Sequence, residues 1–339
     1  MDSICLAYVY RYNINTVFTE AATPSPTNRK SSIVIITLTF CRWESSNLVM
    51  ETYLTTQSAV YHIEEDRYIP GHIIYADQHA LKTTDGLSSH LIAGSVYQSG
   101  YVEGVGEVAR FYDMHSFLQI SPNQVLIADV NNHCLRILDR LTNKTETFSG
   151  NCTESGNVDG VSSLFRYPRT VIIDAKNPDY AFISEYLKKI SLLSRNVSTL
   201  WSGPKQCNSM VQEQTTGNIF LTFPGYIGLL TPPNTLNIVA GSPTVLGFRD
   251  GTFTDTLFES PLALTFLTDY ILLLADSTSK RLRVLDLKSN TSSSICSGIA
   301  GYDDGNLTSC RLISPYSVRS VGNTVFVGDL QRIKMIKRE

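Results

Sequence analysis

The sequence has few charged residues and no long hydrophobic run. Asp, Glu, Lys and Arg make up 17% of its 339 residues, against the ~25% typical of globular domains. The formal net charge is −3, so the chain lacks the basic surface that nucleic-acid binding requires. Its main apolar run, within residues 28–41, is about half the ~20 residues that a membrane-spanning helix needs. We expect neither a nucleic-acid partner nor a membrane span.

Residues 1–45 differ from the rest of the chain. Residues 1–20 lack the basic start and apolar core of a secretory signal. Residues 28–41, NRKSSIVIITLTFC, do have two basic residues followed by an apolar run. This segment is either a displaced, signal-like sequence or a β-strand, and the composition does not choose between them. We expect residues 1–45 to be an N-terminal appendage to one domain spanning residues 46–339.

A repeated unit dominates that domain. Residues 125–139, VLIADVNNHCLRILD, have an alternating apolar strand, an acid, a polar turn and a second alternating strand. Similar segments begin at His72, Ala181, Asn218, Ile271 and Thr324. The acid recurs in five of the six copies, and the fourth copy has Phe223 instead. These acids are Asp77, Asp129, Glu185, Asp276 and Asp329.

Each of the first five copies is followed by a third strand that closes on Gly. Further along, an acid–Gly pair and then usually Pro precede the next copy, as in VDGVSSLFRYP at residues 158–168. Four short antiparallel strands cannot bury both faces of their sheet unless neighbouring sheets stack on them. Six units therefore predict an all-β, six-bladed β-propeller of four-stranded antiparallel blades. The last copy lacks a fourth strand, so an N-terminal strand from residues 48–63 or 33–40 must close the ring.

The acid–Gly, Phe, Pro and Ala-Asp-x-Asn pattern resembles the NHL-repeat β-propeller family, specifically its extracellular type. The resemblance covers roughly residues 65–339 and is weakest in the fourth copy. It implies a propeller but no single function, because members include enzymes, RNA-binding proteins and extracellular binding scaffolds.

Residues that recur in the blades are expected to be structural. The acid of each copy is expected to accept N–H groups from its own turn. Asn131 and Asn132 are expected to adopt left-handed conformations there, and Arg136 to pair with an acid across a blade boundary. The acid–Gly pairs are expected to form turns. Three aromatic residues are expected between blades, namely Phe111, Phe165 and Phe258.

Cysteines and glycosylation sequons carry different information because they depart from the repeat. Antiparallel pairing would bring Cys134 close to Cys152, and Cys296 and Cys310 close a short loop, so two disulfides are predicted. Cys207 has no obvious partner. Sequons at Asn143, Asn196 and Asn290 all fall between the third and fourth strands, where Asn also suits a hairpin turn. Together these features predict an extracellular or secretory-pathway glycoprotein.

Enzymatic relatives of this fold can be tested against the residues. A zinc lyase needs three histidines spread around the ring, but all six lie between His62 and His133. No G-x-S-x-G motif is present. A calcium-dependent hydrolase of the gluconolactonase or paraoxonase type is the alternative. It would use acids and amides from several blades, with candidates at Asp113, Asn123, Asp174, Asn208, Asp269 and Asn323.

The function predicted from these observations is a non-enzymatic binding scaffold. Such a scaffold presents one propeller face to a protein, peptide or carbohydrate ligand. We assign no catalytic or cofactor-binding residue, and the metal site, if calcium is bound, is not located. Aromatic residues in the loops between blades are ligand-contact candidates or packing residues, namely Tyr97, Tyr101, Tyr112, Tyr167 and Phe248.

Overall fold

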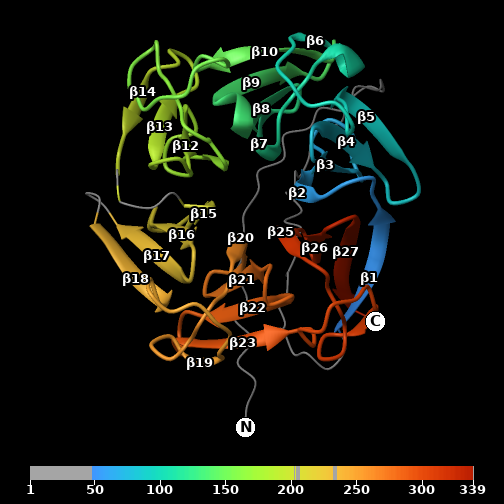
Figure 1. Ribbon diagram of the computed structural model, residues 1–339, viewed down its shortest axis with the longest axis vertical. Helices are drawn as coiled ribbons and strands as arrows, with labels where there is room; N and C mark the ends of the chain where they lie inside the picture. Colours follow the sequence, from blue (N-terminus) through green and yellow to red (C-terminus); the bar gives the residue numbers. More distant parts are fainter. Residues whose placement is uncertain (1–47, 202, 204–206, 232–234, 339) are drawn as a thin grey trace, which may run out of the picture. The chain divides into compact units, whose positions relative to one another are not determined.

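The described chain forms a ring of six antiparallel β-sheets (Figure 1). The computed structural model describes residues 48–201, 203, 207–231 and 235–338. The predicted appendage at residues 1–45, including the signal-like segment 28–41, lies outside them. No helix among these residues is long and apolar enough to cross a membrane. The predicted all-β, six-bladed propeller is confirmed.

Each blade runs outward from an inner strand beside the ring centre. Blade 1 contains β2 (Val60–Glu65), β3 (Ile73–Asp77), β4 (Ala80–Thr84) and β5 (Ser89–Gly94). Blade 2 contains β7 (Met114–Ser121), β8 (Gln124–Asp129), β9 (Cys134–Asp139) and β10 (Lys144–Ser149). Blade 3 contains β11 (Val171–Ile173), β12 (Tyr180–Ile183), β13 (Lys188–Ser191) and β14 (Val197–Thr199).

The remaining blades follow the same order. Blade 4 contains β15 (Ser209–Gln212), β16 (Ile219–Phe223), β17 (Tyr226–Thr231) and β18 (Thr235–Gly241). Blade 5 contains β20 (Pro261–Thr268), β21 (Ile271–Asp276), β22 (Arg281–Asp286) and β23 (Thr291–Ile295). Blade 6 contains β25 (Pro315–Val321), β26 (Thr324–Asp329), β27 (Arg332–Arg338) and β1 (Leu48–Thr55). We call the face where the inner strands begin the upper face, and the opposite one the lower face.

The N-terminal strand β1 closes the ring. It pairs antiparallel with β27 from Leu48 opposite Arg338 to Thr55 opposite Arg332. The predicted region 48–63 supplies this strand from its first part only. Its last part, from Val60 onward, belongs to the inner strand of blade 1. The other candidate, residues 33–40, lies outside the described part of the chain.

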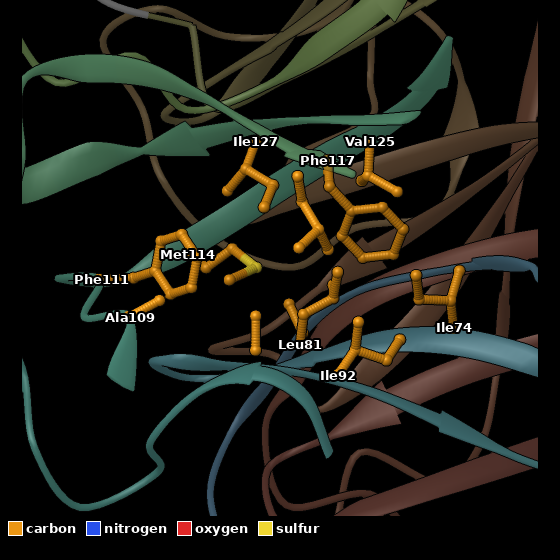
Figure 2. Packing of buried hydrophobic residues seen from close by; sticks show 12 residues of the cluster. Ile74, Leu81, Ile92, Ala109, Phe111, Met114, Phe117, Val125 and Ile127 are labelled. Carbon is orange, nitrogen blue, oxygen red and sulfur yellow. The ribbon is translucent and has the colours of Figure 1, made fainter. Parts of the chain in front are cut away.

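Apolar side chains fill the spaces between neighbouring blades. Figure 2 shows the cluster between blades 1 and 2, where Ile74, Leu81 and Ile92 face Phe111 and Phe117. Complete burial of one such side chain contributes roughly 1.5–3 kcal/mol. Equivalent clusters between other blades contain the remaining predicted aromatics, Phe165 and Phe258. The prediction that these three phenylalanines are inter-blade core is confirmed.

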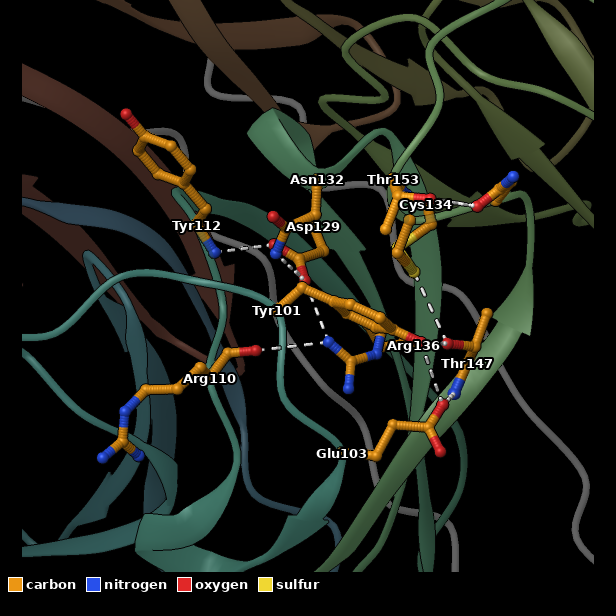
Figure 3. The surroundings of a disulfide bond; sticks show 12 residues. Tyr101, Glu103, Arg110, Tyr112, Asp129, Asn132, Cys134, Arg136, Thr147 and Thr153 are labelled. Carbon is orange, nitrogen blue, oxygen red and sulfur yellow. Dashed lines mark hydrogen bonds and ion pairs between the residues drawn. A yellow bond between two sulfur atoms is a disulfide. The ribbon is translucent and has the colours of Figure 1, made fainter.

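A buried cation occupies the same place on the third strand in five blades. These residues are Lys82, Arg136, Lys188, Arg283 and Lys334, and each side chain is almost or fully inaccessible. In blade 2 the Arg136 guanidinium lies 3.1 Å from Asp129, at the end of the neighbouring strand (Figure 3). The pairing is therefore within one blade, and the prediction that Arg136 pairs across a blade boundary was wrong.

The repeated acids bind backbone N–H groups, but not those of their own turns. Asp129 accepts the N–H of Tyr112, and Asp329 accepts those of Ile313 and Ser314. Those donors precede the inner strand of the same blade, so the acid fixes the segment that leads into it. The polar turn after Asp129 also differs from expectation. His133, with φ 57°, is its left-handed residue, because residues 130–132 form a 3₁₀ turn.

The acid–Gly pairs form a short fifth strand at the blade edge, not the predicted turns. Gly104 in β6 (Gly104–Val105) pairs with Thr145 of β10, and β19 (Gly251–Thr252) and β24 (Gly305–Asn306) do the same in blades 5 and 6. Gly160 bridges Val197 in blade 3. The acid then meets the buried cation. Asp159 lies 2.8 Å from Lys188, Asp250 lies 2.7 Å from Arg283, and Asp304 lies 2.8 Å from Lys334.

In blades 3 and 6 the cation lies between an inner acid whose pKa is raised and an outer acid whose pKa is lowered. Burial raises the pKa of Asp129 to about 6 and that of Glu185 to about 7. Burial also opposes ionisation of the outer acids Asp159 and Asp304, but their lysine partners and backbone donors hold both pKa values below the usual range. The outer acid is thus the better ionised partner. In blade 4 the cation is replaced by Gly228 and the acid by Phe223, which stacks on Tyr226.

We predict that replacing a buried cation is far more damaging than replacing an exposed one. Arg136→Met should lower the free energy of unfolding by about 3–5 kcal/mol, because the Asp129 carboxylate stays buried without its partner. Urea denaturation measures this loss. Lys144→Met is the control, since Lys144 and its partner Glu146 are both half exposed, and it should cost much less. Equal losses for the two variants would contradict the assigned role.

Candidate binding site in the central channel

Six residues, one from each blade, surround the upper end of the central channel. Each follows the Pro at the start of the inner strand or just before it, or the residue equivalent to that Pro. They line a cavity of about 250 Å³ and are Tyr61, His115, Arg169, Asn208, Leu262 and Tyr316. The six positions carry five residue types, whereas the cations and acids inside the blades recur. Because these six positions differ from blade to blade while the residues inside the blades repeat, we expect a binding site specific to this chain here.

Aromatic rings form one wall of this channel cavity. The Tyr61 ring stacks on His115 with centroids 4.4 Å apart, and it meets Tyr316 edge-on at 5.4 Å. Burial and the nearby Asp113 carboxylate raise the pKa of Tyr61 to about 12. Burial, together with the positive charge of Arg169, lowers the pKa of His115 to about 3. At neutral pH the stacked pair of Tyr61 and His115 is therefore uncharged, with polar edges and apolar ring faces.

Arg169 supplies the positive charge of the channel cavity. Its Nη1 lies 3.4 Å from the Asn208 side-chain oxygen, and its buried Nε has no hydrogen-bond partner among the described residues. Asn208 is itself held by the carbonyl of Pro261. No acid lies within ion-pair distance of Arg169 in the described part of the chain. A guanidinium with unused donors favours a planar anionic group such as a carboxylate.

The charges deeper in the channel are paired. Glu64 on β2 lies 3.2 Å from Arg319 on β25 and 3.4 Å from His62. Burial alone would raise the pKa of Glu64, but Arg319 and His62 hold it at about 2. Arg319 in this deeper layer thus has a carboxylate partner, whereas Arg169 has none among the described residues. Arg169 therefore has the charge best placed to meet a ligand.

Two of the five loop aromatics extend this site across the upper face. Tyr112 and Tyr167 pack edge-on against His79 and His133 and remain partly exposed. Tyr101 and Phe248 have a different role, because Tyr101 covers the Arg136 guanidinium and Phe248 covers Arg281 and Arg283. Tyr97 is 79% exposed and lies at the rim of blade 1.

The calcium-ligand candidates do not form one set. Asp113 and Asn208 precede inner strands and so lie toward the upper face. Asn123, Asp174, Asp269 and Asn323 follow inner strands, at the opposite end. Asp174 is paired with Lys189 at 2.8 Å. Within the described residues no group of three or more His, Cys, Asp or Glu side chains is arranged to hold a metal.

Both predicted cysteine pairs are disulfide-bonded in the structure. Cys134 at the start of β9 is joined to Cys152 beyond β10, and Cys296 is joined to Cys310. Each link closes a short loop, for which the chain-entropy contribution is about 3 kcal/mol. Cys207 is a buried free thiol whose Sγ donates to the Ser184 carbonyl, and burial raises its pKa to about 12. Cys5 and Cys41 lie outside the described residues.

The three aligned sequons lie on the lower face, away from the channel site. Asn143, Asn196 and Asn290 are all in hairpins between third and fourth strands. Asn143 and Asn290 adopt φ values of 54° and 53°, which suits Asn in such turns. Glycan attachment at these positions therefore stays a prediction.

Sequence reasoning placed ligand contacts in the loops between blades, which stays a prediction, and it missed Arg169 and most of the residues around it. Only Asn208 was singled out, and as a calcium ligand. The available signal was the residue after Pro. Aligning Arg169 after Pro168 with Leu262 after Pro261 and Tyr316 after Pro315 shows a variable position beside a Pro that recurs in three blades.

Comparison with known proteins shows the fold and no closer relationship. No family model and no curated protein matches the sequence, so membership of the NHL-repeat family stays a prediction. An auxiliary nutrient binding protein from Bacteroides ovatus superposes with a TM-score of 0.67 at 14% identity, covering 86% of this chain and 77% of that one. A Bacteroides thetaiotaomicron protein provisionally named a phosphatase gives 0.62 at 12% identity, with coverages of 86% and 79%. A chain of the nidogen–laminin complex gives 0.52 at 11% identity, with coverages of 76% and 85%.

We predict that His115 stays neutral across the physiological range. Its ring signals in NMR spectra should not titrate between about pH 4 and pH 8, because burial and Arg169 both disfavour the charged ring. In Arg169→Gln the pKa of His115 should rise but stay below its usual ~6.5, since burial is the larger cause. His115→Asn assigns the resonance. Titration near pH 6.5 in the unmodified protein would mean that the channel cavity is open to water.

Proposed function

We propose that this chain is a non-enzymatic binding scaffold that presents its upper face to a protein, peptide or carbohydrate ligand. The ligand places an acidic group in the channel cavity against Arg169. Its apolar or sugar-ring surface lies on the aromatic wall formed by Tyr61, His115 and Tyr316. Tyr112 and Tyr167 add contacts around the mouth of the channel cavity.

The unused donor of Arg169 is the observation that carries this proposal. Burying a polar group without a partner costs free energy, so such a group calls for an explanation, and a bound ligand, ion or water is one. The surrounding residues hold Arg169 in place through Asn208 but do not neutralise it. A carboxylate arriving from a ligand completes the pair, and the neighbouring rings bury the atoms that carry it.

The same proposal places the protein outside the cell. Two disulfides persist in oxidising compartments and are rare in the cytosol. The three sequons of the lower face are spaced around one rim, where attached glycans would leave the upper face open for a ligand. The calcium-dependent hydrolase is the alternative function, and its candidate ligands lie at both ends of the channel.

We predict that ligand binding depends on the charge of Arg169. Arrays of peptides and oligosaccharides, with and without carboxylate groups, identify the bound class. Arg169→Gln should weaken binding of the best ligand by about tenfold or more, as expected for a charge-assisted hydrogen bond. Arg195→Gln is the matched control, because Arg195 lies in a lower-face hairpin, and it should change affinity less than about twofold.

Two results would overturn this function. One is equal binding by Arg169→Gln and the unmodified protein. The other is stoichiometric calcium that survives dialysis, accompanied by activity on lactones or aryl esters.

We predict a defined covalent map for the protein secreted from eukaryotic cells. Mass spectrometry should find the Cys134–Cys152 and Cys296–Cys310 links and glycan on at least one of Asn143, Asn196 and Asn290. Treatment with a glycosidase that converts glycosylated Asn to Asp provides the control for site assignment. Free thiols at all four positions together with no glycan would exclude the extracellular assignment.

A further inference from the structure

Blade 1 lacks the outer segment that four other blades have. In blades 2, 3, 5 and 6 an acid–Gly pair lies along the fourth strand. The chain reaches each of these segments during a long connection from the preceding blade. The connection from β1 to β2 is only residues 56–59, so no such segment can form. As a result β5 is an edge strand, paired only with β4 among the described residues.

Blade 1 nevertheless keeps the buried cation that the outer segment normally meets. Lys82 Nζ lies 2.7 Å from Asp77, its inner acid. On its other side it donates at 2.8 Å to the amide oxygen of Gln57. On this outer side Lys188 and Lys334 each pair with a carboxylate, whereas Lys82 has only a neutral acceptor. Blade 4 also lacks an outer segment, but it has lost the cation as well.

A groove occupies the place of the missing segment. Its volume is about 890 Å³, within the range of ligand-binding clefts, and Lys82 lies in its lining. The β5 side contributes Ser89 and Leu91, and the opposite side contributes Tyr97, Val108 and Arg110. The groove therefore joins a buried positive charge, an open strand edge and exposed apolar side chains.

The strand register shows what the groove is shaped to hold. In blades 2, 3 and 6 the fourth-strand residue opposite the cation donates its backbone N–H to the outer acid. These residues are Thr147, Thr199 and Thr52. The residue opposite Lys82 is Leu91. One residue of β5 next to Leu91 is left out of the strand pairing, as one residue of β10 is next to Thr147. Leu91 is 43% exposed. By this equivalence its N–H faces the open edge.

We propose that this groove binds an extended acid–Gly segment of a partner protein as an added edge strand. The partner's carboxylate pairs with Lys82 and accepts the Leu91 N–H, as Asp159 does with Lys188 and Thr199. The following Gly passes Ser89 with a positive φ, as Gly104, Gly160, Gly251 and Gly305 do at φ values from 101° to 155°. Strand addition gives affinity through backbone hydrogen bonds, and the buried charge gives selectivity.

The occupant is expected from another molecule because this chain has no free segment of the required kind. Residues 1–47 contain no glycine. Four of the acid–Gly pairs already occupy their own blades, and the fifth, Asp85–Gly86, forms the turn between β4 and β5. A second copy would have to open one of its blades to donate a segment. This rim site is separate from the channel cavity and does not rest on the proposed function.

The test uses a peptide taken from the chain itself. The heptapeptide GNVDGVS, residues 156–162, carries the acid–Gly pair that serves Lys188, a lysine like Lys82. Fluorescence polarisation measures its binding to the full chain, and NMR follows the Leu91 amide. We expect saturable binding with a shift of that amide. Replacing the peptide's Asp by Asn should weaken binding by about tenfold.

Variants of the protein test the two contacts separately without removing the buried lysine. Gln57→Glu places a carboxylate beside Lys82 and should weaken binding by about tenfold. Leu91→Pro removes the N–H and should do the same, since proline is tolerated on an edge strand. Ile238→Glu is the matched control, because Ile238 holds the equivalent rim position in blade 4 opposite Gly228, and it should change affinity less than about twofold.

Four outcomes would overturn the proposal. They are no saturable binding at millimolar peptide, equal binding of the Asp and Asn peptides, unchanged binding by Gln57→Glu, and a Leu91 amide already protected from exchange without peptide. The last would mean that the chain or a second copy fills its own groove, and measurement of the molecular mass in solution separates those two cases. Loss of peptide binding in Arg169→Gln would be a fifth such outcome, because it would place the peptide in the channel cavity.

Discussion

The buried cation on the third strand is the interaction on which the blades depend. A desolvated lysine or arginine is costly unless it is paired and hydrogen-bonded. In blades 2, 3, 5 and 6 different combinations of the inner acid, the outer acid and carbonyls of the connecting segment meet that requirement. Arg136, for example, donates to the carbonyls of Val102 and Arg110 as well as to Asp129. The cation therefore fastens the connection from the previous blade to the sheet that it crosses, while apolar packing holds adjacent sheets face to face.

Variation at this position explains how a repeating scaffold acquires individual features. Blade 4 replaces the charged set with Phe223, Tyr226 and Gly228, which packs the same space without ionised groups. Blade 3 keeps the cation but has a longer inner acid, Glu185, whose second carboxylate oxygen is buried without a partner among the described residues. Blade 1 keeps the cation and leaves its outer side open. The channel ring varies for a different reason, because its six side chains face one another and not the interior of a sheet.

The architecture could be predicted from sequence because all six copies repeat the strand periodicity, and five of them repeat the acid and five the closing glycine. The disulfides could be predicted because antiparallel strands bring Cys134 close to Cys152, and because Cys296 and Cys310 close a short loop. Contacts that depend on hairpin register were harder. Arg136 is seven residues after Asp129, and the two meet because of the register of the hairpin that contains the 3₁₀ turn. The two-residue strand at Gly104 has no alternation to detect, so it was assigned as a turn. Arg169 lies outside regular structure, and its importance depends on which five residues face it.

The pairing of β1 with β27 has a consequence for the order in which the protein folds. About 280 residues separate the two strands, so this contact has a very long loop to close and a correspondingly slow rate of formation. During synthesis β1 leaves the ribosome before the blades are made, and β27 follows all the other strands of the ring. Five sheets can assemble in between, each stacking on the one before it. Throughout that interval β1 is an unpaired strand, and the cell must keep it from pairing elsewhere until the last blade is made.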